Sequence, residues 1–286
     1  MGKIVIVGSG PAGCSAALYA ARAGQEVVVI SMGMGALSKA ELIQNYYGFE
    51  EGITGAELYR QGVAGAKAVG AEFITAEVVG LDYTGSLVVQ TTEGDYPADA
   101  VILATGAGRI APKIAGLAEH EGRGVSYCAT CDAFFYRGKT AAVLGSGEYA
   151  LHEVQALLPL AGRVILCTNG EPLTADFPEG VEICTEKLAA VEGEEKVSAL
   201  RLENGELLPV EGLFVALGVA GSAALARNLG APVENGRIVV DERMQTGIPG
   251  LYAAGDCTGG LLQVCKAVYE GALAATEAIK QIRGKK

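Results

Sequence analysis

The hydrophobic positions near the N-terminus form short continuous runs separated by glycine-rich turns. Lys3 to Val7 is one such run, and the stretch CSAALYAARAG that follows its glycines has the alanine and leucine content, and the terminal Gly24, of a helix. EVVVI then follows as a second apolar run of strand length. This order predicts a strand–helix–strand unit at the start of the chain.

The same pattern occurs again in the middle of the chain. Ala141 to Leu144 is predicted to be a strand, a helix follows to about Leu160, and Arg163 to Cys167 is predicted to be the next strand. The turn between the first strand and the helix contains Gly145, Gly147 and Ala150. An internal repeat of one architecture predicts two nucleotide-binding-type folds in one chain.

Shorter strands and a last helix complete the predicted fold. VEICTE, KVSALRLENGELLPV with a hairpin signal at Asn204-Gly205, and GLFVALG close the second domain, and GLYAAGD leads into a helix over Leu262 to Ile282. The expected fold is α/β, with two Rossmann-like domains of the dinucleotide-binding type, the second inserted into the first. The first domain is expected to comprise residues 1–107 and 236–286, and the inserted domain residues 108–235.

The first glycine turn has the spacing of a dinucleotide site. Gly8, Gly10 and Gly13 form G-x-G-x-x-G between strand and helix, where glycines permit a tight turn, close approach of a pyrophosphate and close helix packing. The acidic residue expected at the end of the second strand is replaced by Ser31, whose hydroxyl is an alternative ribose partner. A glycine-rich turn without a ligand is the competing interpretation.

Composition and charge narrow the class of protein. Half of the residues are hydrophobic, 19% are charged, glycine is abundant at 41 and tryptophan is absent, which is typical of a tightly packed α/β enzyme. The net charge of −11 argues against nucleic acid as a partner. No apolar run approaches the roughly 18 to 20 residues of a membrane span, and no signal sequence is recognised, so a cytoplasmic protein is expected.

Seven cysteines include one closely spaced pair, Cys128 and Cys131. Two such cysteines at the start of a helix can form a redox-active disulfide, because the helix dipole and free N–H groups favour a thiolate. The carboxylate of Asp132 opposes a thiolate and is therefore better suited to carry a proton. Half a zinc site is the alternative; with only His120 and His152 as histidines and no second C-x-x-C, no metal is expected.

The other five cysteines have simpler interpretations. Cys14, Cys167 and Cys184 lie in predicted apolar elements and are expected to be small core residues. Cys257 and Cys265 are close enough in sequence to be considered as a second redox pair, although the glycines between them favour incidental packing.

Four segments together resemble one family. GSGPAG at 8–13, ATG at 104–106, GRGVSYCATCDAFFYRGK at 122–139 and NGRIVVDERMQTGIPGLYAAGD at 235–256 are similar to the low-molecular-weight thioredoxin reductases. The resemblance implies FAD, a homodimer, and thioredoxin as the disulfide partner. It implies that Cys131 lies against the flavin, that Cys128 attacks the partner disulfide, and that Asp132 manages the proton. The implied FAD-binding residues are Gly8, Gly10, Pro11, Ala12, Gly13, Asn45, Ala104, Thr105, Gly106, Gly255, Asp256 and Gln263.

The chain departs from this family at the residues of the inserted domain that would bind NADPH. The basic cluster that follows the strand and reads the 2′-phosphate of NADPH is replaced by Thr168, Asn169 and Gly170, and Glu171 comes too late to hold an NADH ribose. The family's segment after GLFV is replaced by ALGVAGSAAL. The inserted domain is therefore expected to be a degenerate NADPH-type fold.

The chain resembles the ferredoxin-linked flavin thioredoxin reductases, which have the FAD domain and the cysteine pair but lack the NADPH signatures. This resemblance implies reduced ferredoxin as electron donor. The residues around the cysteine motif carry a local excess of positive charge, which would favour binding of an acidic ferredoxin or a thioredoxin. An ordinary solvated surface fits the same charges equally. The basic residues are Arg109, Lys113, Arg123, Arg137 and Lys139, and the acidic ones are Glu119, Glu121 and Asp132. The alternatives are an NADH- or NADPH-dependent thioredoxin reductase, a flavin-dependent dithiol oxidase, and a non-enzymatic flavin sensor.

Overall fold

The computed structural model describes residues 2–107, 113–217 and 221–284. The chain divides into two compact units. The first unit comprises Met1–Arg109 with Gly221–Lys286, and the second comprises Ile110–Ala220. Among the helices of these described ranges, none combines the length and the apolar character needed to cross a bilayer.

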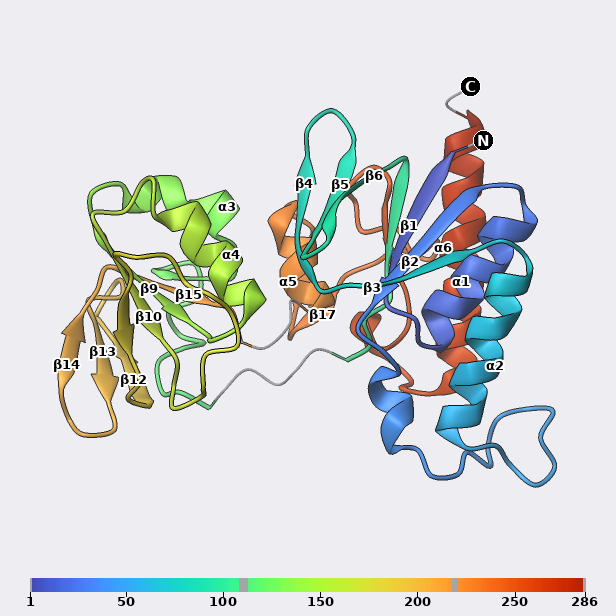
Figure 1. The fold of residues 1–286 in the computed structure, drawn as a ribbon, viewed down its shortest axis with the longest axis horizontal. Coiled ribbons are helices and arrows are strands. Elements are labelled where there is room, and N and C mark those ends of the chain that lie inside the picture. The colour runs from blue at the N-terminus through green and yellow to red at the C-terminus, as the bar shows by residue number, and fades with distance from the viewer. Residues whose placement is uncertain (1, 108–112, 218–220, 285–286) are drawn as a thin grey trace. The chain divides into compact units, whose positions relative to one another are not determined.

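The first unit is built on a five-stranded parallel sheet with the order β18-β7-β1-β2-β3. Its strands are β1 (Lys3–Val7), β2 (Glu26–Ser31), β3 (Glu72–Thr75), β7 (Ala100–Leu103) and β18 (Leu251–Ala253). Helix α1 (Pro11–Arg22) packs against both α2 (Gly55–Ala68) and α6 (Val264–Gly284), as Figure 1 shows. The apolar strands β1, β7 and β18 are buried throughout their central residues because helices and the rest of the unit cover them.

Smaller elements complete the first unit. An antiparallel meander joins β3 to β7 and consists of β4 (Val78–Tyr83), β5 (Leu87–Thr91) and β6 (Gly94–Ala98). Helix α5 (Ser222–Asn228) packs on β4, and the hairpin of β16 (Val233–Glu234) and β17 (Arg237–Ile238) follows it. The hairpin turn places Asn235 at φ 49° and Gly236 at φ 71°, the left-handed conformations that an Asn-Gly turn adopts readily.

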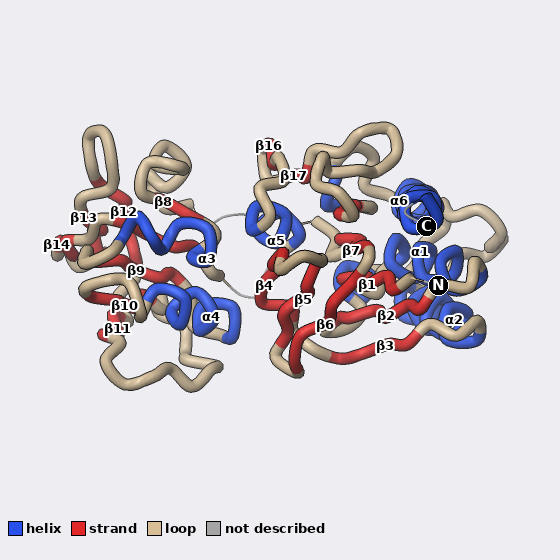
Figure 2. Tube along the Cα trace, turned by 90° about the horizontal axis from the view of Figure 1, so that it is seen from above, coloured by secondary structure: helices blue, strands red, loops and turns tan. Residues whose placement is uncertain are grey.

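The second unit has a parallel sheet with the order β11-β10-β9-β15-β8. Its strands are β8 (Val125–Ser126), β9 (Thr140–Leu144), β10 (Arg163–Cys167), β11 (Glu182–Cys184) and β15 (Gly212–Val215). A meander of β12 (Leu188–Glu192), β13 (Ala199–Leu202) and β14 (Leu207–Pro209) leads into β15. Helices α3 (Ala129–Asp132) and α4 (Glu148–Leu157) lie side by side, as Figure 2 shows.

The two sheets share one arrangement, which confirms the predicted α/β class and its internal repeat. In the first unit β1, and in the second unit β9, is flanked on one side by the next two strands in sequence and on the other by the strand that follows the meander. The helix after the second glycine turn ends at Leu157, three residues before the predicted end, because the N–H groups of Leu160 and Ala161 both turn back to the Leu157 carbonyl.

The second join between the units differs from the expected position at 235. Residues 221–235 belong to the first unit, because the start of α5 is hydrogen-bonded to the end of β7. The Ser222 amide donates to Thr105 Oγ1 at 2.9 Å, and the two hydroxyl oxygens lie 2.5 Å apart. Leu225 and Ala226 are also buried there. The first join, expected at 108, falls outside the described residues.

Candidate active site

Three of the predicted cofactor segments meet at one edge of the first sheet. The turn Gly8 to Gly13 follows β1, Ala104 to Gly106 follows β7, and Gly255 with Asp256 follows β18. Because these three strands are parallel neighbours, their carboxyl ends lie together. A Cβ placed on Gly255 would lie 3.0 Å from the Ala12 Cβ, so the segments are in contact.

The glycines of this turn have different physical requirements. A Cβ on Gly8, which has φ +110°, would lie 2.3 Å from the Ala104 carbonyl oxygen, and one on Gly13 would lie 1.8 Å from the Gly8 oxygen. A Cβ on Gly10 would meet no atom within 4 Å. Gly10 is also the N-cap of α1, and no side chain caps this helix end. Open space beside the N–H groups of a helix N-terminus fits a pyrophosphate.

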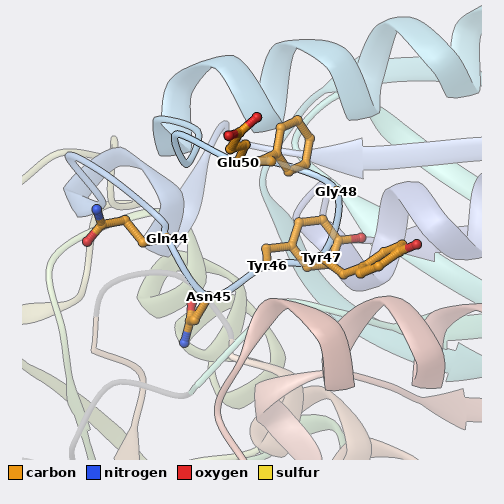
Figure 3. Close-up of a pocket in the computed structure, with 7 residues that line it drawn as sticks. Gln44, Asn45, Tyr46, Tyr47, Gly48 and Glu50 are labelled. Carbon is orange, nitrogen blue, oxygen red and sulfur yellow. The ribbon is translucent and has the colours of Figure 1, made fainter.

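Asn45 and Gln263, predicted as flavin contacts, are brought together although 218 residues separate them. The Asn45 side-chain amide donates to Gln263 Oε1 at 2.9 Å. Asn45 belongs to the loop from Gln44 to Glu50, which lines a shallow surface depression of about 570 Å³ and which Figure 3 shows in close-up. The structure therefore supports a common role for these two amides.

A buried ion pair holds the turn that carries Asp256. Lys266 and Glu270 of α6 lie 3.0 Å apart, with side-chain exposures of 15% and 11%. The Gly255 amide donates to Glu270 Oε2 at 2.8 Å, and Lys266 Nζ donates to the Gly255 carbonyl at 2.7 Å. Asp256 itself is half-buried. Sequence reasoning missed this pair, although its i, i+4 spacing on the last helix was a usable signal.

Ser31 takes the place of the acidic ribose partner at the end of β2. Its hydroxyl donates to Ser9 Oγ at 2.7 Å, and Ser9 Oγ lies 3.1 Å from the Tyr59 hydroxyl. The strand end therefore carries a short network of hydroxyl groups instead of a carboxylate.

In the second unit, Cys128 and Cys131 form a disulfide with Cα atoms 5.4 Å apart. Cys128 is the N-cap of α3, and its Sγ accepts a hydrogen bond from the Cys131 amide at 3.1 Å. Cys128 is 4% exposed, whereas Cys131 is exposed. This burial differs from the expectation that Cys128 attacks an external disulfide, because an attacking sulfur has to reach its target.

Asp132 is held beside the disulfide by Ser126. The Ser126 hydroxyl donates to Asp132 Oδ2 at 2.7 Å, and the Cys128 amide donates to Ser126 Oγ at 3.1 Å. Burial, and to a smaller extent the Asp132 carboxylate, raise the pKa of Tyr136. The predicted proton carrier is therefore connected to the backbone of Cys128 through one serine, which sequence reasoning did not identify.

A second carboxylate, Glu153 of α4, contacts the N-terminus of α3. It is 1% exposed, and its Oε2 accepts a hydrogen bond from the amide of Ala129, the first residue of α3. Its Oε1 has no hydrogen-bond partner, and His152 Nδ1 lies 3.5 Å from that oxygen. No sequence motif marks Glu153, because its role depends on α4 packing against α3.

The second glycine turn differs from the first in being covered. A Cβ on Gly147 would lie 3.0 Å from Thr174 Oγ1, and the Thr174 amide donates to the Ser146 carbonyl at 2.8 Å. After β10, the Asn169 side chain accepts a hydrogen bond from the Leu188 amide at 2.9 Å. The loop that follows β10 thus folds back over the turn that corresponds to Gly10.

One cation lies at this corner that sequence reasoning missed. A Cβ on Gly170 would lie 3.1 Å from Cε of Lys187, whose side chain is exposed. No local sequence pattern identifies it, because Lys187 lies beyond β11, 17 residues after Gly170.

The remaining candidate ligands have structural partners. The two ring nitrogens of His120 lie 2.7 Å from the Gly116 carbonyl oxygen and 3.1 Å from that of Gly193. Cys257 is buried and Cys265 is exposed, and both are free thiols. Within the described residues, no group of three or more His, Cys, Asp or Glu side chains is placed to hold a metal ion.

An open glycine turn in one parallel-sheet unit and a C-x-x-C disulfide in the other define a nucleotide-dependent disulfide oxidoreductase. In agreement, the family profile for pyridine nucleotide-disulphide oxidoreductases matches residues 2–271. The curated thioredoxin reductase of Aquifex aeolicus (strain VF5) is 35% identical over 305 residues, covering 99% of this chain and 94% of that protein. The chain belongs to the low-molecular-weight thioredoxin reductase family.

Solved structures of the same family are similar throughout the chain. The atypical thioredoxin reductase TRi from Desulfovibrio vulgaris Hildenborough is 40% identical, covers 99% of both chains and has a TM-score of 0.93. A ferredoxin-flavin thioredoxin reductase from Clostridium acetobutylicum is 35% identical, covers 99% of this chain and 98% of its own, and has a TM-score of 0.74.

FAD is the cofactor, in keeping with this family. The open space at Gly10 and the adjacent end of α1 fit its pyrophosphate, and the hydrogen-bonded side chains of Asn45 and Gln263 are the amide groups that would face its ring system. Bound there, FAD supplies a group that exchanges electrons singly or in pairs and can reduce a disulfide.

Proposed function

We propose that this protein reduces thioredoxin through its Cys128–Cys131 pair and that its electrons come from reduced ferredoxin. The observation that carries the donor assignment is the difference between the two glycine turns. The turn at Gly10 is open, whereas Thr174 covers the turn at Gly147 and bonds to Ser146. A dinucleotide phosphate has to approach the backbone of such a turn closely, and at Gly147 the Thr174 side chain lies in that approach.

The residues after β10 support the same assignment. Thr168 is buried, and the side-chain oxygen of Asn169 already accepts a hydrogen bond from the backbone of Leu188. The Thr168 hydroxyl is therefore not accessible to an adenosine ribose, and the Asn169 oxygen is already used as an acceptor. One of the similar solved proteins is a ferredoxin-flavin thioredoxin reductase, which supports the proposed donor.

We propose that exchange with thioredoxin occurs at Cys131, which is exposed. After the disulfide has taken up two electrons and one proton, Cys131 is a thiolate and Cys128 a thiol. The Cys131 thiolate attacks the thioredoxin disulfide, and one thioredoxin thiolate leaves. The Cys128 thiol then loses its proton and attacks Cys131 Sγ, which releases the second thioredoxin thiolate and restores the disulfide. Asp132 is suited to accept or return a proton in these steps, because Ser126 holds it beside Cys128.

The surface next to the disulfide suits a protein partner. Phe134 and Phe135 follow α3 directly and are 66% and 67% exposed. Arg137 lies 5.3 Å from the Phe134 ring centroid, so an aromatic surface is combined with positive charge. Adjacent exposed aromatic side chains are typical of docking surfaces. Arg109, which sequence reasoning added to this basic group, lies outside the described residues. We further propose a homodimer, as the family resemblance implies.

The donor is tested by thioredoxin reduction under anaerobic conditions, with ferredoxin, NADPH and NADH offered separately. Turnover with reduced ferredoxin alone is expected. Turnover with a nicotinamide cofactor at micromolar concentration would refute the donor assignment and leave the thioredoxin reductase activity in place.

The exchange step is tested with the two single variants, Cys128→Ser and Cys131→Ser. Cys128→Ser is expected to accumulate a stable mixed disulfide with thioredoxin, and Cys131→Ser is expected to form none, because its remaining thiol is buried. The reverse result would restore the role that the family resemblance first implied for Cys128.

Lys187 supports a second candidate, an NADPH-dependent thioredoxin reductase. Its ammonium group is the cation next to the corner where the 2′-phosphate would lie. This candidate requires the loop around Thr174 to withdraw. Bleaching of the flavin by NADPH, but not by NADH, together with loss of that bleaching in Lys187→Met, would favour it.

A further inference from the structure

Two cysteines outside the active site face each other across neighbouring strands of the second unit. Cys167 is the last residue of β10 and Cys184 the last residue of β11, and the two are partners in the parallel register. The Thr168 amide donates to the Cys184 carbonyl at 2.9 Å, so the strands remain paired at this end. Both thiols are free in the structure.

The spacing of paired strands brings the two thiols within reach of a covalent bond. Neighbouring strands lie about 4.7–4.9 Å apart, and disulfides join Cα atoms about 4.4–6.8 Å apart. β11 is an edge strand of three residues, and Cys184 is at its end, where the backbone has most freedom to adjust. Little movement is therefore needed to join the sulfurs.

The two thiols differ in the way that a reactive pair requires. Cys167 is fully buried, whereas Cys184 is half-buried and reachable from solvent. The hydrogen bond from the Cys167 thiol lowers the pKa of Cys184 to about 6, despite the opposing carboxylates of Glu186 and Glu206. The same contact, followed by burial, raises the pKa of Cys167. At neutral pH, Cys184 is the nucleophile and Cys167 the protonated partner.

We propose that Cys167 and Cys184 form a second redox pair, which a hydroperoxide oxidises to an intrachain disulfide. The Cys184 thiolate attacks the peroxide; with hydrogen peroxide and one proton, this gives a sulfenic acid at Cys184 and one water. The Cys167 thiol then attacks that sulfur, and the hydroxyl leaves as a second water. The two thiols lose two electrons, and the peroxide gains them.

This pair is separate from the reductase site. It lies at the carboxyl end of β10, next to the loop that folds back over the Gly147 turn, and no step of thioredoxin reduction uses it. The other free cysteines lack these properties. Burial raises the pKa of Cys14 to about 12 and that of Cys257 to about 11, and Cys265 is exposed and free.

The test uses the FAD-loaded Cys128→Ser/Cys131→Ser double variant, in which the active-site disulfide cannot form. The protein is reduced, freed of reductant, treated with hydrogen peroxide, then unfolded and alkylated for intact mass and peptide analysis. The expected result is the loss of two alkylation sites and a cross-linked pair of peptides containing Cys167 and Cys184. A phosphine reductant should restore both sites.

Further variants on this background separate the steps. In Cys167→Ala, a dimedone adduct should accumulate at Cys184, because no thiol resolves the sulfenic acid. Cys184→Ala should slow peroxide-dependent thiol loss at least roughly tenfold, whereas the matched control Cys265→Ala should leave the cross-link unchanged. Persistent alkylation of both Cys167 and Cys184 after peroxide treatment, or irreversible oxidation of Cys184 with no cross-link, would overturn the proposal.

Discussion

The two glycine turns offer a matched pair of substitutions, Gly10→Ala and Gly147→Ala. Gly10 has φ −69° and ψ −171°, Gly147 has φ −118° and ψ −165°, and each is the N-cap of its helix without a side-chain cap. Both backbones accept alanine. Each substitution should therefore cost about 1 kcal/mol of apoprotein stability, the typical loss when alanine replaces a preferred N-cap residue.

The effects on FAD should separate the two variants. The new methyl group of Gly10→Ala meets no protein atom within 4 Å, so it projects into the space assigned to the pyrophosphate. Loss of two hydrogen bonds to a charged group, at about 1.5–3 kcal/mol each, corresponds to a roughly 10²- to 10⁴-fold weaker affinity for FAD. The methyl group of Gly147→Ala meets Thr174 Oγ1 at 3.0 Å and no ligand.

Affinity is measured by titrating both apoproteins with FAD and following flavin fluorescence, and apoprotein stability by thermal unfolding. Gly10→Ala should purify with little flavin, and its apoprotein melting temperature should fall by only about 2–4 °C, as a loss of about 1 kcal/mol implies. Gly147→Ala should retain flavin and thioredoxin reduction. Normal FAD affinity in Gly10→Ala would show that the pyrophosphate binds elsewhere. Loss of ferredoxin-driven turnover in Gly147→Ala, with flavin retained, would show that the second turn does bind a ligand.

Three further predictions follow from the buried polar groups. Lys266→Met leaves the Glu270 carboxylate buried without its charge partner and should lower the free energy of unfolding by about 3–5 kcal/mol in thermal denaturation. The additional change Glu270→Leu should recover only part of this loss, because the Gly255 amide then loses its acceptor. Glu153→Leu removes the acceptor of the Ala129 amide and should cost about 1–3 kcal/mol, whereas Glu153→Gln keeps an acceptor and should cost less; equal losses would contradict this role. Alkylation of Cys184 by iodoacetamide should rise with pH through a midpoint near 6, since the thiolate reacts and its pKa is lowered to about 6; a midpoint at the ordinary value of 9.0 would refute the thiol–thiol contact.

The sequence predicted those parts of the fold that depend on local patterns. Continuous apolar runs bounded by glycines identified β1, β2, β9 and β10, because buried parallel strands have that pattern. The predicted end of α4 lay three residues too late, and the join between the units expected at residue 235 was also misplaced. The join depends on the hydrogen bonds between Thr105 and Ser222, which are 117 residues apart and carry no local signature.

In the candidate site, too, residues marked by a sequence motif were predicted, whereas residues that act through tertiary packing were not. The family motifs brought Asn45 and Gln263 into the prediction, and their hydrogen bond places them together. Ser126 and Glu153 were missed, because each acts through a contact that only the packing of α3 creates. The burial of Cys128 also could not be predicted, since spacing alone does not distinguish the two sulfurs of a C-x-x-C pair.

The covered turn at Gly147 has a consequence for engineering the electron supply. Grafting arginines onto positions 168–170 would provide charge for a nicotinamide cofactor, but Thr174 would still lie against the turn at Gly147 and donate its amide to the Ser146 carbonyl. Point substitutions are therefore expected to fail. Exchange of the whole connection over residues 168–174 for that of an NADPH-using relative is the smallest graft that supplies the cations and also removes Thr174 from the turn.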